Sequence, residues 1–175
     1  MSPQQTTEIV QALMDSRAEF HAAAEVSEAQ AKLSPAPGRW SVLDCVEHIV
    51  FVEGRFLGWL QNPETQPAPP PPAPPIDKQR EAQILSRVAS RANRVQAPEA
   101  VHPAGRFATL AEALEQFHAV RARSIAFAES QGADLYSLAA RHPFFGPLNG
   151  AEVMLLMAAH SRRHAAQIDE VRSAL

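Results

Sequence analysis

Apolar residues recur every three or four positions along most of this chain, the spacing that places them on one face of an α-helix. The pattern predicts long helices over 6–32, 41–60 and 109–130, a short helix over 77–94, and a last long helix through 151–171. No sustained alternation of apolar and polar residues indicates a β-strand. We therefore expect an all-α protein in which residues 1–175 form a single domain, with the short helix between the second and third long helices.

The last predicted helix carries two histidines in its apolar stripe, which consists of Val153, Met157, His160, His164, Ile168 and Val171. An imidazole without a hydrogen-bond partner in such surroundings costs about 1–3 kcal/mol, whereas neutral imidazole is a common metal ligand. Residues four apart on a helix have Cβ atoms about 5–6 Å apart, so His160 and His164 can approach one ion. Core histidines that hydrogen-bond to other groups show the same spacing, so the pair alone leaves both interpretations open.

A third candidate ligand lies in the helix predicted over 41–60. This helix begins with a capping pattern, Ser41 followed by Asp44. It is apolar nearly all round, which indicates deep burial or an additional interface. His48 falls in its second turn, inside the apolar run. Cys45, one turn earlier, is a conceivable fourth ligand, although a lone cysteine in such a run is more typical of a small buried apolar residue.

Two connections differ from ordinary loops. Residues 62–75 contain eight prolines and predict an extended segment. At about 3.1 Å per residue, such a segment is long enough for the third long helix to run parallel to the second. We interpret it as a spacer and not as a recognition motif. The segment 131–150 carries Phe144, Phe145 and Leu148 among prolines and glycines, which predicts a packed lid over one end of the bundle, with His142 on it or anchoring it.

Composition narrows the choice of partners. A net charge of −3 with scattered arginines argues against nucleic acid. The chain has no apolar run long enough for a membrane span and no leader pattern, so we expect a cytoplasmic protein. One cysteine rules out an internal disulfide.

The remaining histidines before the lid segment have no partner at ligand spacing along the sequence. They are expected at the surface or at the mouth of the site, and they are His21, His102 and His118.

Three motifs in this order resemble the DinB/YfiT-like superfamily over almost the whole chain, about residues 6–174. They are a helix start with Trp40, Ser41 and His48, a loop with His142, Pro143, Phe145, Gly146, Pro147 and Leu148, and a final helix with His160, Arg163, His164, Gln167 and Ile168. The resemblance implies a four-helix bundle of up-down-down-up topology with a proline-rich crossover. It also implies homodimers and a divalent metal, most often zinc or nickel, held by His48, His160 and His164. Relatives include S-transferases and isomerases that use low-molecular-weight thiols such as bacillithiol or mycothiol, and others described as metal-dependent hydrolases.

Three imidazoles leave a metal position for water or substrate, which suits either thiol transfer to a small electrophilic substrate or hydrolysis. Hydrolysis needs a general base, and neither Glu47 nor Glu152 is well placed along its helix, so thiol transfer is favoured. A non-catalytic metal-binding bundle, or a dimeric stress-related one, remains the alternative from another class. Four further residues are candidates for orienting an imidazole or for binding substrate at the mouth: Gln167, Arg163, His142 and Cys45. Arg162 is a further candidate for attracting an anionic substrate.

Overall fold

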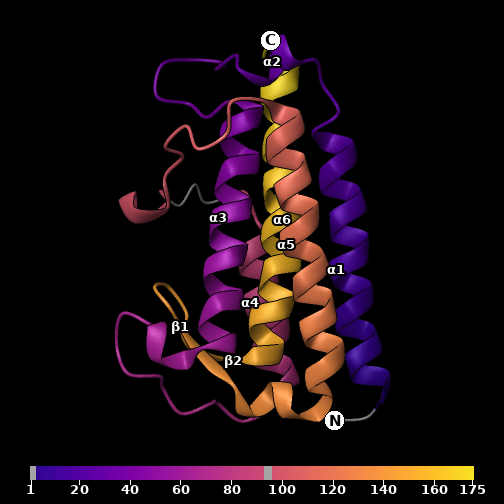
Figure 1. The fold of residues 1–175 in the computed structure, drawn as a ribbon, viewed down its shortest axis with the longest axis vertical. Coiled ribbons are helices and arrows are strands. Elements are labelled where there is room, and N and C mark those ends of the chain that lie inside the picture. Colours follow the sequence, from indigo (N-terminus) through magenta and orange to yellow (C-terminus); the bar gives the residue numbers. More distant parts are fainter. Residues whose placement is uncertain (1–2, 93–95) are drawn as a thin grey trace.

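Four long helices pack side by side in this protein (Figure 1). A computed structural model describes residues 3–92 and 96–175. The long helices are α1 (Pro3–Ala23), α3 (Val42–Gln61), α5 (Leu110–Gln131) and α6 (Gly150–Ser173), and the shorter α4 (Lys78–Ala89) lies against α6. The minor elements are α2 (Glu28–Ala31), η1 (Pro63–Thr65), η2 (Glu99–Val101), η3 (Gly132–Ser137), β1 (Ala139–His142) and β2 (Gly146–Asn149). The predicted all-α four-helix bundle is confirmed.

The chain runs along α1 and α6 in one direction and along α3 and α5 in the other, so the up-down-down-up topology is also confirmed (Figure 1). The segment that connects the end of α3 to the start of α5 takes a different course from the predicted one. The proline-rich segment stays at one end, where Gln66 bonds to Ala139 and Arg141 of β1. Helix α4 then runs along α6, because Arg80 pairs with Glu152 near one end of α6 and Arg91 pairs with Glu170 near the other.

Two predicted helices end earlier than expected. The first stops at Ala23 and not near residue 32, because Ser27 begins a separate helix, α2, with a capping box completed by Gln30. The helix predicted over 77–94 stops at Ala89, and Ser90 is extended. The end of that prediction, residues 93–94, lies outside the described residues. The short α2 caps the start of α5, since the Glu28 carboxylate accepts from the free backbone N–H groups of Leu110 and Ala111.

A small β-hairpin, β1–β2, replaces the lid loop that was expected before α6. Its strands pair antiparallel, with Ala139 opposite Asn149 and His142 opposite Gly146. Gly146 has a φ of 70°, a conformation that side chains disfavour. Strands of four residues are too short to show a recognisable alternation, so they could not be predicted from the sequence. Leu148 is fully buried, as a packed lid requires, but Phe144 is exposed.

The bundle core has two apolar clusters with a buried polar layer between them. The layer consists of Ser16, Glu53, Arg121, Ser124 and Ser161, one or two residues from each long helix, all 0–3% exposed. Arg121 donates to both carboxylate oxygens of Glu53 at 2.8 Å, to the two serine hydroxyls of α1 and α6, and to the Leu13 carbonyl. On each helix these residues separate the members of one cluster from those of the other. A buried charge is tolerated here because every donor of its guanidinium has an acceptor.

Candidate metal centre

His48, His160 and His164 come together between α3 and α6. One nitrogen of each imidazole lies within 4.8 Å of the others, and the Nε2 atoms of His160 and His164 are 3.1 Å apart. The local structure explains this placement. The capping box of Ser41 and Asp44 fixes where α3 begins, so that His48 falls on the inner face of its second turn. The two histidines of α6 face the same way because they are four residues apart.

A backbone carbonyl fixes the tautomer of His48. The carbonyl oxygen of Val101, in η2, lies 2.7 Å from His48 Nδ1. Because a carbonyl only accepts, Nδ1 carries the hydrogen and the lone pair remains on Nε2. Histidines that bind metals are usually oriented in this way by a hydrogen bond to the other ring nitrogen.

The segment that supplies this carbonyl is tied to α3 by Glu47. Its carboxylate is 1% exposed and accepts from the backbone N–H groups of Ala104 and Arg106, at 2.5 and 2.9 Å, and from the Arg106 guanidinium at 2.6 Å. Glu47 was considered as a general base, but these three hydrogen bonds hold the 101–106 segment. In the sequence, the position of Glu47 in an otherwise apolar helix was the sign that its carboxylate is buried against a structural partner.

The histidine cluster is not satisfied by protein groups alone. His164 is buried, and its Nδ1 has no hydrogen-bond partner in the described part of the chain. Trp40 covers the cluster, with its ring stacked at 15° on His164 and its centroid 4.8 Å from that of His48. Three neutral imidazoles whose nitrogens converge form a donor set that fits a divalent ion of the zinc or nickel type.

Burial keeps these imidazoles neutral. Loss of solvation lowers the pKa of His48 and lowers the pKa of His160 and His164 well below the ordinary value of 6.5. The neighbouring imidazoles act in the same direction on His160 and His164, since two positive charges this close would repel. At neutral pH each ring therefore has a lone pair available for a metal.

His142 lies on the hairpin beside this site. Its ring stacks at 12° on Phe56, with centroids 5.6 Å apart, and its Nδ1 accepts from the backbone N–H of Phe144. Burial lowers the pKa of His142 to about 4, so the ring is neutral at pH 7 and carries its hydrogen on Nε2. A charge on His142 would lower the pKa of His160. The prediction that His142 belongs to the mouth of the site is consistent with this position.

Of the three other candidates, Cys45 is the buried apolar residue that its sequence context favoured, and the other two have partners other than an imidazole. Cys45 is fully buried, and burial raises the pKa of its thiol, so it is an apolar core residue and not a thiolate. Gln167 was expected to orient an imidazole, but its amide oxygen accepts from Arg91. Arg163 donates to the carbonyls of Val88 and Ser90 at the end of α4. These last contacts hold α4 against α6 next to the histidines.

Arg162 was a candidate for attracting an anionic substrate, and it pairs with the exposed Glu19 of α1. The remaining histidines also have partners. His102 Nε2 donates to the Ala97 carbonyl, and the ring lies edge-on to Trp40. His21 and His118 have no partner at ligand spacing along the sequence, but α1 and α5 bring their nitrogens to 3.1 Å from each other.

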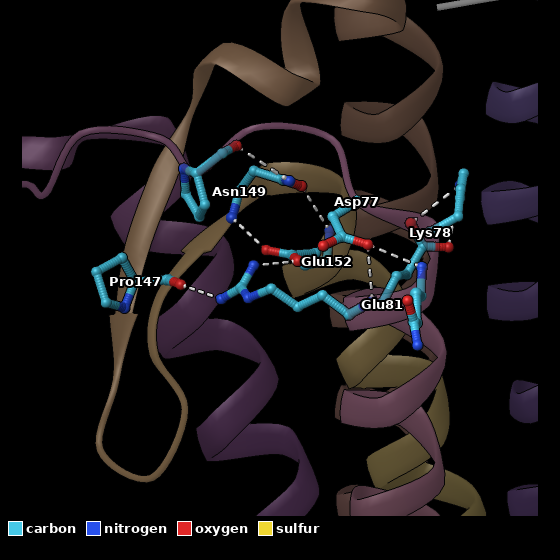
Figure 2. A network of polar contacts seen from close by, with 9 residues as sticks. Asp77, Lys78, Glu81, Pro147, Asn149 and Glu152 are labelled. Atoms are coloured by element: carbon cyan, nitrogen blue, oxygen red, sulfur yellow. Dashed lines mark hydrogen bonds and ion pairs between the residues drawn. The ribbon is translucent and has the colours of Figure 1, made fainter.

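Glu152 is not placed to act as a base. Figure 2 shows it in a polar network with Asn149 and Pro147, at the start of α6. Its carboxylate completes the capping box of Asn149 and pairs with Arg80, which also donates to the Pro147 carbonyl. Two turns of α6 separate this network from His160. Its role is to join α4, the hairpin and the start of α6.

A cavity of about 10 Å³ lies beside His160, between α3 and α6. Glu53 and Ser161 of the polar layer also line it, together with apolar side chains. This volume is at the lower limit for a single water molecule. Both carboxylate oxygens of Glu53 already accept from Arg121, so this acid is also engaged.

The fold and the histidine cluster define a class of helical bundles with a three-histidine site that can hold a metal ion. Residues 12–168 match the DinB superfamily, and the chain belongs to it. Among solved structures it is similar to YfiT from Bacillus subtilis, described as a probable metal-dependent hydrolase with an unusual four-helix bundle topology. The TM-score is 0.61 at 17% identity, over 99% of this chain and 89% of that chain, a likeness that supports the fold alone. No curated protein matches the chain.

None of the helices in 3–92 and 96–175 combines the length and the apolar content needed to span a membrane.

Proposed function

We propose that this protein is a divalent-metal-dependent enzyme in which His48, His160 and His164 hold the ion. We further propose that it transfers a low-molecular-weight thiol to a small electrophilic substrate. The observation that supports this proposal is the convergence of three neutral imidazoles, with one nitrogen of each within 4.8 Å of the others. Zinc and nickel are the metals that best suit this donor set.

A divalent ion at such a site lowers the pKa of a bound thiol or water and so supplies a nucleophile at neutral pH. The thiol reaction is favoured because it needs no carboxylate base. Glu47, Glu53 and Glu152 are the buried acids in or near the site, and each is engaged in hydrogen bonds to structural partners. In the transfer, the sulfur forms a bond to the electrophilic carbon, the leaving group departs with its electron pair, and the thiol proton goes to solvent.

The residues around the cluster support this chemistry. Val101 holds the His48 ring with its Nε2 lone pair available. Trp40 shields His48 and His164 from water. The neutral His142, with its Nδ1 occupied by Phe144, offers an Nε2 hydrogen that can stabilise negative charge on a leaving group. It does not serve as a base, because its remaining nitrogen already carries the hydrogen.

Metal-dependent hydrolysis is the second candidate. The water-sized cavity beside His160 favours it, and YfiT is described as a probable hydrolase of this kind. A non-catalytic metal-binding or dimeric stress-related bundle is the third. A homodimer is proposed in each case, and sedimentation of the purified protein tests it directly.

The metal site is tested by elemental analysis of protein purified without an affinity tag. We expect about one equivalent of metal that depends on His160, so His160→Ala should lose it, while the exposed Glu115→Gln should not. Absence of metal in the wild type, even after dialysis against zinc and nickel, would rule out the metalloenzyme.

The reaction is tested with the metal-loaded protein. Cysteine, bacillithiol and mycothiol are each supplied with an electrophilic bimane, and p-nitrophenyl esters are supplied without thiol. Transfer that requires both thiol and metal supports the proposed function. Ester hydrolysis without thiol supports the second candidate instead, and a metal-loaded protein inactive in both assays favours the non-catalytic bundle.

A further inference from the structure

A second pair of histidines meets on the other side of the bundle, between α1 and α5. His21 lies in the last turn of α1, and His118 lies in the middle of α5. The His118 Nε2 and His21 Nδ1 atoms are 3.1 Å apart, and the ring centroids are 4.9 Å apart. Both residues are partly exposed, so solvent reaches the pair. Their neighbours Phe20 and Phe117 contact each other in the core, which fixes the two helices at this height.

The distance between the His118 and His21 nitrogens equals the distance between the two predicted metal ligands of α6. His160 and His164 also place two nitrogens 3.1 Å apart. An ion at about 2.05 Å from two nitrogens with this separation would make an N–metal–N angle of about 100°, close to tetrahedral. The pair therefore needs no rearrangement of helices to accept one ion.

The charges around the pair are mixed but favour a cation. The Glu25 carboxylate lies 3.6 Å from His21 Nε2, on the side of the ring away from His118. A carboxylate in this position favours a hydrogen on Nε2 and leaves the Nδ1 lone pair for a metal. The C-terminal end of α1 adds negative potential. Arg17, one turn earlier, acts in the opposite direction.

The protonation state of His118 also suits binding of a metal cation. Partial burial lowers its pKa, and the charges of His21 and Arg17 lower it further. The ring is therefore neutral at pH 7, the form that binds metals.

We propose that His21 and His118 form a second site for a divalent cation of the borderline class, zinc, nickel or copper(II). Two imidazoles supply protein ligands, and water completes the coordination. Hard ions such as magnesium and calcium, which prefer oxygen ligands, are not expected to bind. The site does not depend on the three-histidine centre, since it uses other residues on other helices.

The test is equilibrium dialysis of the full chain against zinc and, separately, magnesium, followed by elemental analysis. We expect two equivalents of zinc in the wild type and none of magnesium. His118→Gln and His21→Gln should each lose one equivalent, and His160→Ala should lose the other. The exposed Glu129→Gln, also on α5, serves as the matched control and should keep both.

A second measurement locates the ion without reliance on stoichiometry. Copper(II) broadens amide NMR signals near its binding site, and we expect broadening around residues 21 and 118 that His118→Gln abolishes. Unchanged zinc content in both glutamine variants would overturn the proposal and leave a hydrogen-bonded imidazole pair only. Loss of metal in His160→Ala alone would support the three-histidine centre and reject the second site, so the two proposals fail separately.

Discussion

Replacing Glu47 should weaken metal binding although its carboxylate bonds to Ala104 and Arg106 and not to a histidine. The carboxylate ties the 101–106 segment to α3, and that segment supplies the carbonyl that orients His48. Glu47→Gln keeps the size of the side chain but turns one acceptor oxygen into a donor amide. At least one of the three hydrogen bonds is then lost, and the remaining ones are made to a neutral acceptor in place of a charged one.

The magnitude follows from these contacts. A hydrogen bond to a charged group contributes about 1.5–3 kcal/mol, against about 0.5–1.5 kcal/mol for a neutral one. Arg106 is 38% exposed in its side chain, so its share is reduced by solvent. We expect Glu47→Gln to lower the free energy of unfolding by about 1–3 kcal/mol. Loss of a partner that orients a ligand typically reduces metal affinity about 10–100-fold, and we expect the lower end because Glu47 acts through the segment.

Zinc affinity is measured by competition with a colorimetric chelator, and stability by urea titration of the metal-free protein. Arg106→Ala is the informative comparison, because it removes the guanidinium and leaves both backbone bonds to Glu47 in place. It should reduce stability with little change in affinity. If Glu47→Gln destabilises the protein but binds zinc as tightly as the wild type, the inferred role of the segment is wrong.

Three further perturbations test the fold. Arg121→Met leaves Glu53 buried without its cation and should cost about 3–5 kcal/mol in urea titration; adding Glu53→Leu should recover part of this, and a double variant no more stable than the single would contradict the assignment. Ser41→Ala removes the N-cap of α3 and should lower the free energy of unfolding by about 1 kcal/mol, whereas no change would show that the cap is unimportant. The metal-free protein should lose stability as pH falls from about 6.5 toward 4, because imidazoles bind protons in the unfolded chain but not where they are buried. Each such imidazole lowers the free energy of unfolding by about 1.4 kcal/mol per pH unit. Thermal melts at pH 7, 6 and 5 measure this slope, and His142→Gln should make it shallower; an equal slope would show that His142 does not titrate as described.

The features that the sequence predicted well are those set by neighbours in the chain. The capping box at Ser41 involves residues three apart, so it is visible in the sequence and is present in the structure. His160 and His164 face the same way for the same reason. His48 was found from its position in an apolar run, which indicates burial whatever the partner helix is.

The features that escaped prediction depend on contacts between distant residues. The Val101 carbonyl has no side-chain signature, and it meets His48 across 53 positions. His21 and His118 are 97 positions apart, and no spacing rule links them. The proline-rich segment was expected to cover the length of the bundle because its extended reach permits this, but Gln66 binds it to the hairpin. Chain stiffness sets how far a segment can extend and does not determine where its contacts hold it.

The polar layer around Arg121 also determines how the helices can slide. A shift of one helix by a turn, about 5.4 Å, would carry its serine or Glu53 out of reach of the guanidinium and leave a buried charge unpaired. Apolar clusters alone would resist such a shift much less, because one leucine can replace another. The relative heights of His48 on α3 and of His160 on α6 are therefore fixed from inside the bundle, by a layer next to them in both helices. It follows that changes in the length of the connecting segments can leave the geometry of the histidines intact, whereas a change at residue 53 can alter it without touching an imidazole.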